Sequence, residues 1–271
     1  MALRVNDDSN ILSALRQSQI NQSDIGKRLS SIASGLRINQ TSDDAAGLAV
    51  AESLSSQSRG LDVASRNIQD FMSLTQTAEA GLSGIQNMSQ RINELALQAS
   101  TGTLTSEDRQ LIQGEISQIS QEIDRQAGST EFNGTPLLNG SFSGSTQIGA
   151  NPGNVFTLNL SATTAAALGL TGIDVSTQAG AQNAVSVAQG AVNSVATERA
   201  SIGSTMNRLQ LAADTAQVAQ ENTLASESVI RDSDMALEMI GLAAAQIRSN
   251  AGVAALAQGN INRENAARLL G

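Results

Sequence analysis

The chain has 271 residues, and its 25 acidic and 16 basic side chains give a net charge of −9. It contains no His and no Cys, which excludes the commonest general base, the thiol nucleophile and the usual zinc ligands. Aromatic residues make up only 1% and Pro occurs twice, a composition that suits long aliphatic helices packed side by side. We therefore expect no catalytic residue, no metal and no cofactor, and the acidic balance disfavours a nucleic-acid partner.

The N-terminus carries no apolar run of signal-peptide length, and no later stretch approaches the length of a membrane span. We expect no membrane partner. Taken alone, these features predict a cytoplasmic protein, unless a dedicated export machinery reads something other than a cleavable signal. The lack of Cys means that no disulfide holds the fold, which is compatible with passage between compartments as an unfolded chain.

A heptad pattern dominates the first forty residues. Its positions alternate by four and three residues and hold Ile11, Leu15, Ser18, Gln22, Ile25, Leu29, Ile32 and Leu36. The pattern predicts a helix with a coiled-coil seam that two polar residues weaken in the middle. Such a helix cannot bury its apolar stripe by itself.

Two more helices are predicted to follow. Asp43 and Asp44 are read either as paired carboxylates for acid and base chemistry or as a helix start, and the helix start is favoured because capping explains them without further assumptions. The long helix that follows ends at the turn 100–103, and the next begins at Thr105 or Ser106. Their apolar rows are Leu61, Ala64, Ile68, Phe71, Thr75, Ala78, Leu82, Ile85, Ile92, Leu95 and Ala99, and then Ile112, Ile116, Ile119 and Ile123.

The middle of the chain, about 128–180, is rich in Gly, Ser, Thr and Asn. Turn dipeptides at 133–134 and 139–140 and the alternating run Phe156, Leu158, Leu160 predict short strands and hairpins. Helical periodicity returns near Ala188 and continues after a break at 231–234. The last apolar row consists of Ile240, Ala243, Ile247, Ala254, Ala257 and Ile261.

The predicted fold class is mainly α: a long coiled-coil-like helical rod with paired terminal helices and a small β-hairpin region in the middle. The terminal helices are rich in Ala, Ser, Gln and Gly, so a contact between two of them does not offset the entropy lost on ordering. Further copies of the same chain are therefore the predicted partners. Head-to-tail contacts that do not close give a filament, self-complementary contacts give a dimer, and the pattern leaves both open.

Five sequence motifs follow one another along the chain. They are 28–39 (RLSSIASGLRIN), 43–47 (DDAAG), 90–98 (QRINELALQ), 131–134 (EFNG) and 227–236 (ESVIRDSDMA). With these motifs the chain resembles the bacterial flagellins, the subunits of the flagellar filament, in a short form without large variable outer domains.

The resemblance implies a structural subunit that polymerises into the filament for motility and is not an enzyme. It implies export as an unfolded chain through the flagellar type III channel, and hence secretion to the extracellular flagellum. The implied partners are further copies of the chain, the flagellar export chaperone, the cap and hook-junction proteins, and host Toll-like receptor 5 among the innate flagellin receptors.

The resemblance also implies five segments. Residues 1–41 form the N-terminal half of the filament-core helical domain (D0-like), and residues 233–271 form its C-terminal half. Residues 42–127 and 183–232 supply the helices of the rod domain (D1-like), and 128–182 form its β-rich tip. The core self-assembly residues are then Ile11, Leu15, Ile25, Leu29, Ile32, Leu36, Ile240, Ala243, Ile247, Ala254, Ala257 and Ile261.

The positions that match the receptor-binding surface of the family are Gln90, Arg91, Glu94, Leu95, Gln98 and Glu115. The alternative is that these residues lie in subunit contacts, and both hold if polymerisation buries them. A hook–filament junction protein is the second structural candidate, but the unbroken 90–98 motif favours flagellin. A lipid-surface binder lacks Trp and basic interfacial residues, and an enzyme-bearing flagellin with a zinc peptidase motif is excluded without His.

Overall fold

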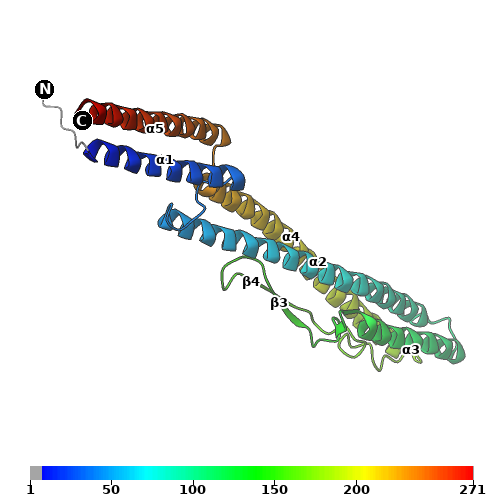
Figure 1. Cartoon of the computed structure of the whole chain (residues 1–271). Coiled ribbons are helices and arrows are strands. Elements are labelled where there is room, and N and C mark those ends of the chain that lie inside the picture. The colour runs from blue at the N-terminus through cyan, green and yellow to red at the C-terminus, as the bar shows by residue number, and fades with distance from the viewer. Residues whose placement is uncertain (1–7, 271) are drawn as a thin grey trace. The chain divides into compact units, whose positions relative to one another are not determined.

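The structure is a computed structural model that describes the backbone of residues 8–270. Side chains are described from residue 12 onward, except at 263, 266, 267, 269 and 270. Its helices are α1 (Asp8–Ser34), α2 (Ala45–Ala99), α3 (Ser106–Ser129), α4 (Gln178–Arg231) and α5 (Met235–Leu270) (Figure 1). The strands are β1 (Glu131–Phe132), β2 (Thr135–Pro136), β3 (Ser143–Gln147) and β4 (Val155–Asn159). The mainly α fold class with a small β-hairpin region is confirmed.

The chain forms two compact units. The first consists of the residues up to 56 and those from 222 onward, and so contains α1, α5 and the adjoining ends of α2 and α4. The second consists of 57–221 and contains the rest of α2 and α4, all of α3 and the strands. The boundaries between the units fall inside α2 and α4, whereas the five-segment division expected from the resemblance begins its second segment at residue 42. That division stays a prediction.

The two adjacent carboxylates before α2 shape the entry to that helix. Asp44 Oδ1 accepts hydrogen bonds from the backbone N–H groups of Ala46 (3.1 Å) and Gly47 (2.9 Å), so it caps the helix N-terminus. Asp43 accepts two backbone N–H groups of the preceding turn and lies 3.6 Å from Lys27 Nζ. Both carboxylates therefore accept backbone hydrogen bonds at the start of α2 or in the turn before it. This confirms the helix-start interpretation.

The turn between α2 and α3 is closed by a reciprocal capping box. Thr105 Oγ1 accepts the N–H of Asp108 (3.2 Å), and the Asp108 carboxylate accepts the N–H of Thr105 (3.1 Å). The hydroxyl and N–H of Thr105 hold the pKa of Asp108 below its ordinary value. Arg109 donates to the carbonyls of Ala99 (2.9 Å) and Thr101 (2.8 Å), so it satisfies acceptors at the C-terminus of α2.

The strands form two separate antiparallel hairpins, β1–β2 and β3–β4. Asn133 (φ 50°) and Gly134 (φ 73°) form the tight turn of the first hairpin, where both central residues need positive φ. In β4, Phe156 and Leu158 point inward while their neighbours are exposed. The period-two pattern therefore predicted this strand correctly.

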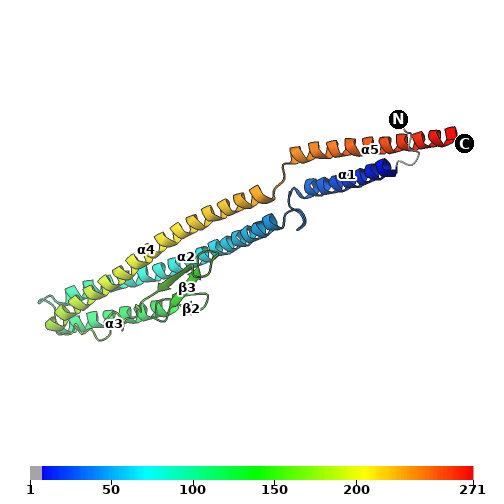
Figure 2. The ribbon, with the colours of Figure 1, turned by 90° about the vertical axis from the view of Figure 1, so that its left-hand side faces the viewer.

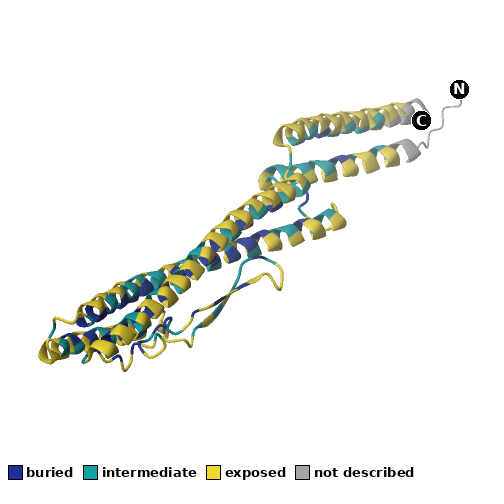
Figure 3. Cartoon of the chain, turned by 180° about the vertical axis from the view of Figure 1, so that it is seen from behind, coloured by how far each residue is buried: buried dark blue, intermediate teal, exposed yellow. Residues whose placement is uncertain are grey.

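The second unit has one continuous, mainly aliphatic core, where α2, α3 and α4 run alongside one another (Figure 2). Its most completely buried side chains come from all three helices, and residues seen in dark blue in Figure 3 concentrate on the facing sides of these helices. The Nε of Arg199 in α4 donates a hydrogen bond (2.8 Å) to the carboxylate of Glu79 in α2. Arg199 also donates a hydrogen bond to the side chain of Gln86. Within the second unit, packing of the core and the Arg199–Glu79 ion pair thus join α2 to α4.

The apolar row predicted for α2 is buried at every position, from Leu61 to Ala99. In α3, Ile112, Ile116 and Ile123 are buried and Ile119 is half-buried. The regular period identified this core because large aliphatic side chains recur on one face over many turns.

Truncation of Ile116, which is 2% exposed, tests this core. We expect Ile116→Ala to lower the free energy of unfolding of the second unit by about 2–4 kcal/mol, because the lost methylene groups leave a cavity. Leu111→Ala on the same helix is the matched control, since Leu111 is 77% exposed and its loss costs less than about 0.5 kcal/mol. Urea denaturation followed by circular dichroism measures both, and equal costs would contradict the assignment.

Candidate functional site

The terminal helices α1 and α5 lie side by side in the first unit and run antiparallel (Figure 1). Their direction follows from two bridges between them, Arg28 to Glu238 and Asp24 to Arg248. Paired terminal helices were predicted, and the structure confirms the pairing. The residues that lie between the two helices, however, differ from the predicted coiled-coil seam.

The line of contact between α1 and α5 consists mostly of small or polar side chains. These buried or half-buried residues include Ala14, Ser18, Asn21, Ile25, Arg28 and Ile32 on α1 and Glu238, Leu242, Ala245, Ser249, Gly252, Leu256 and Gly259 on α5. On α5 they recur at alternating intervals of four and three residues, as in a coiled coil. Small side chains let the helices approach, but they remove little apolar surface from water.

Large apolar side chains of the same two helices lie on the outside. We call Leu12, Leu15 and Leu29 the α1 ridge and Ile240, Ile247 and Ile261 the α5 ridge. These side chains are 48–57% exposed on α1 and 50–69% exposed on α5. The α5 ridge keeps heptad spacing through the exposed Ala254, so it forms a continuous stripe along the helix. Figure 3 shows both helices mainly in the colours of exposed and intermediate residues.

The structure separates the predicted self-assembly residues into groups. Ile25, Ile32 and Leu36 are half-buried, and the side chain of Ile11 lies outside the described residues. The exposed members are Leu15, Leu29, Ile240, Ala243, Ile247, Ala254, Ala257 and Ile261. The heptads on α5 therefore identified the outward face of the helix, and a role of this face in assembly stays a prediction.

A backbone clasp joins the α1–α2 connection to the α4–α5 connection. The N–H of Arg37 donates to the carbonyl of Arg231 (2.7 Å), and the N–H of Ser233 donates to the carbonyl of Gly35 (2.9 Å). Gly35 adopts φ 72°, which turns the chain out of α1. Sequence reasoning missed this clasp. The glycine after Ser34 marked the helix end, but nothing local indicated a partner nearly 200 residues away.

The predicted receptor-binding residues lie in the second unit. The exposed ones are Gln90, Arg91, Glu94 and Gln98 on α2 and Glu115 on α3. Arg91 lies 2.9 Å from Glu115 and 3.3 Å from Glu94, and its hydrogen bonds to Glu115 raise the pKa of Arg91 above its ordinary value. Leu95 differs, because it is only 2% exposed and packs in the core between the helices. Its side chain therefore offers no surface contact.

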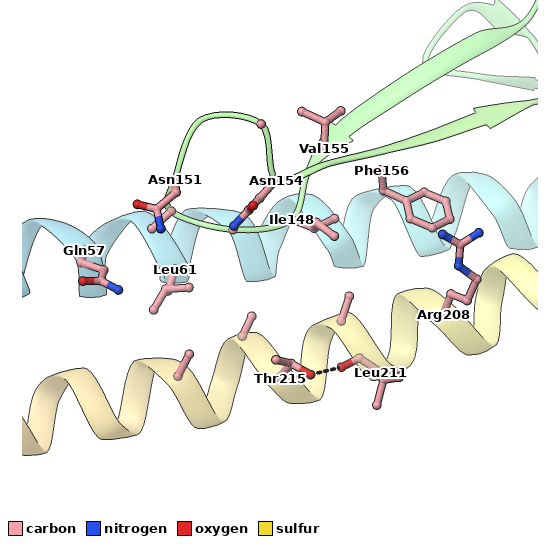
Figure 4. Close-up of a pocket in the computed structure, with 16 residues that line it drawn as sticks. Gln57, Leu61, Ile148, Asn151, Asn154, Val155, Phe156, Arg208, Leu211 and Thr215 are labelled. Carbon is pink, nitrogen blue, oxygen red and sulfur yellow. Dashed lines mark hydrogen bonds between the residues drawn. The ribbon is translucent and has the colours of Figure 1, made fainter.

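A groove of about 570 Å³ lies in the second unit between α2, α4 and the loop after β3 (Figure 4). Leu61, Ile148, Phe156 and Leu211 give it an apolar lining, and the Arg208 guanidinium stands 4.7 Å from the centre of the Phe156 ring. Arg208 is the one ionisable side chain in this lining. The groove thus holds no acid and base pair.

Among residues 8–270, no helix combines the length and apolarity needed to cross a membrane. Within the same described part of the chain, no group of three or more acidic side chains lies close enough together to hold a metal ion.

Comparison with known proteins decides which family has this architecture. The family profile of the bacterial flagellin N-terminal helical region matches residues 5–143, and that of the C-terminal helical region matches 185–270. The chain belongs to the bacterial flagellin family. The first match covers α1 to α3, and the second covers most of α4 and all of α5. Both ridges therefore lie in segments that match the family.

Relatives of full length support the assignment. The flagellar filament core protein flaB2 of Brachyspira hyodysenteriae is 39% identical over 98% of this chain and 99% of its own length. The flagellin of Bacillus subtilis is 37% identical over 99% of this chain and its entire length. The crystal structure of Bacillus cereus flagellin superposes with a TM-score of 0.52 at 31% identity, covering 56% of this chain and 88% of that one.

This flagellin is a structural subunit of the bacterial flagellar filament, which belongs to the extracellular flagellum. The alignments with these two relatives extend over 282 and 303 residues and cover nearly all of each relative, so neither of them exceeds this 271-residue chain by a large outer domain. Because these relatives are filament proteins, the hook–filament junction alternative is not favoured.

Proposed function

We propose that this flagellin polymerises through the α1 and α5 ridges, with neighbouring subunits covering them in the filament core. The observation that carries the proposal is the exposure of Ile240, Ile247 and Ile261, an unbroken apolar stripe opposite the face that meets α1. Monomeric soluble proteins seldom leave such a stripe uncovered. Full burial of one such side chain contributes about 1.5–3 kcal/mol, so covering several holds a subunit firmly in place.

Open, head-to-tail contacts fit this arrangement better than a closed dimer. The two ridges differ in sequence and lie on helices that already face each other through another surface. A neighbour therefore meets different faces on α1 and α5, which is the heterologous kind of contact that propagates into a helical polymer.

We also propose that the chain leaves the cell unfolded through the flagellar type III channel. No Cys is present to lock the fold, and the pairing of α1 with α5 rests on small side chains, so separating these two helices for transport costs little. The export chaperone is then a partner before transport, because the α5 ridge needs cover in the cytoplasm. The cap and hook-junction proteins are partners at the ends of the growing filament.

Host Toll-like receptor 5 is the partner we propose for the exposed cluster around Arg91. Arg91, Glu94 and Glu115 present both signs of charge on adjoining helices, and guanidinium groups are frequent anchors in protein interfaces. Leu95 is left out of this surface because it is buried. Polymerisation that covers the cluster would restrict recognition to the free subunit.

We propose no enzymatic activity. The apolar groove of the second unit offers a single ionisable side chain, and the chain has neither His nor Cys. General acid and base catalysis needs at least one positioned group that exchanges a proton near neutral pH.

Polar substitution of the α5 ridge tests the assembly proposal. We expect Ile240→Gln with Ile247→Gln to abolish growth of long tubes from filament seeds, because the amides lose the transfer energy of the buried side chains. Negative-stain electron microscopy after seeding measures the outcome. The control is Ile240→Val with Ile247→Val, which keeps the stripe apolar and should assemble. Tubes of normal length from the Gln variant would contradict the proposal.

A reporter-cell assay tests the receptor proposal. We expect Arg91→Ala in purified monomer to raise the half-maximal concentration by about tenfold or more, as loss of an interface anchor does. Arg66→Ala is the matched control, since Arg66 lies on the same helix and makes a comparable exposed ion pair with Asp62 (2.9 Å). The proposal fails if wild-type monomer is silent at every soluble concentration, or if the two variants respond alike.

A further inference from the structure

Methionine is the main oxidisable residue type of this chain. Cys, His, Trp and Tyr, the other side chains that oxidants attack readily, are all absent from the sequence, whereas Met occurs six times. Hydrogen peroxide transfers one oxygen atom to the Met sulfur: the S–O bond forms, the peroxide O–O bond breaks and water is released. The sulfur loses two electrons and the peroxide gains them, so no further reactant is needed. A peroxide that meets this protein therefore acts chiefly on Met.

The Met residues differ in their access to solvent. Three of them are half-buried against the core of the second unit, namely Met72, Met88 and Met206. Two others lie at the start of α5, where Met235 is 42% and Met239 is 61% exposed. The remaining one, Met1, lies outside the described residues. Pairing with α1 leaves both α5 sulfurs accessible, and separation of the two helices exposes them further, so these two should react first in the free subunit.

Met239 extends the outward apolar surface of α5. It lies four residues before Ala243 and eight before Ile247, and residues four apart are neighbours on one side of a helix. All three side chains are exposed. Met239 also directly precedes Ile240, the first member of the α5 ridge, which is 69% exposed. In the proposed assembly, a neighbouring subunit that covers Ile240 and Ile247 therefore covers Met239 as well.

Oxidation changes the free energy of burying Met239. The sulfoxide replaces an apolar thioether by a strongly polar group whose oxygen accepts hydrogen bonds. Burial of such an acceptor without a donor is unfavourable, and Ala243 and Ile247, the next residues on the same side of α5, present only alkyl groups. Oxidised subunits therefore lose part of the apolar contact, while the separate core of the second unit keeps its packing.

We propose that Met239 is a reversible oxidation site, at which peroxide acting on the free subunit weakens its addition to the filament. After addition, the neighbouring subunit covers the sulfur and slows the reaction. Methionine sulfoxide reductases, one for each epimer of the sulfoxide, reverse the change. This inference rests on the proposed use of the α5 ridge in polymerisation.

Peroxide treatment of the full-length monomer is the first test. Peptide mass spectrometry should find Met239 oxidised several times faster than the three Met residues of the second unit. We expect the critical concentration for seeded growth to rise by about tenfold, because an unpaired polar group must then be buried. Equal oxidation rates at all these sites, or normal growth of subunits that carry the sulfoxide at residue 239, would overturn the proposal.

Two Leu substitutions on α5 form a matched pair that assigns the effect to one sulfur. Leu is apolar and close to Met in volume, so Met239→Leu and Met235→Leu should both assemble like wild type before treatment. After peroxide, we expect Met239→Leu to stay within about twofold of its untreated critical concentration. Met235→Leu should lose growth as wild type does, because it keeps the sulfur at residue 239. Loss of growth in the treated Met239→Leu variant would contradict the assignment.

Reversal and protection complete the test. Treatment of oxidised monomer with both sulfoxide reductases should restore growth, and growth that stays lost after complete reduction would overturn the proposal. In assembled filaments Met239 should oxidise more slowly than in the monomer, and equal rates would show that no neighbour covers it. Failure here is distinguishable from failure of the proposed function. If the Ile240 and Ile247 Gln variant cannot assemble while oxidised wild type assembles normally, the ridge is the contact and Met239 does not control it.

Discussion

The pairing of α1 with α5 through small side chains is the constraint on which the first unit depends. Gly241 and Ala245 lie where α5 comes close to α1, but the pair leaves larger Ile and Leu side chains in water. The hydrophobic effect then favours any arrangement in which further copies cover these ridges. In the proposed assembly, subunits associate because the pair leaves these side chains unburied.

The second unit, in contrast, buries most of its large aliphatic side chains. Its helices bury Leu82, Ile85, Ile92, Ile116 and Ile202 almost completely, so the unit has a core of its own. We propose that its exposed charges around Arg91 and Glu115 form the receptor surface of the free subunit. We propose that the subunit combines this unit, which has its own core, with a first unit that neighbouring copies of the chain complete.

Much of the fold was predictable because long helices repeat their pattern many times. The buried row of α2, the Asp44 cap, the Thr105 helix start and the tight turn at Asn133 all follow from local sequence. The contact face of α5 was not predictable, because Ala occupies positions around the whole helix. Periodicity therefore does not show which face meets α1. The pairing of Arg28 with Glu238 joins residues 210 positions apart, and no local pattern indicates such a contact. The burial of Leu95 shows that a matched motif does not reveal which members face inward.

Amide hydrogen exchange, compared between free monomer and assembled filament, measures most directly whether neighbours complete the first unit. We expect amides of α1 and α5 to exchange rapidly in the monomer and to gain strong protection in the filament, because the pair alone buries too little surface to resist opening. Amides near Ile85 and Ile202 should be protected alike in both states. Equal, strong protection of α1 and α5 in a monomer that stays single at high concentration would contradict the dependence on neighbouring copies.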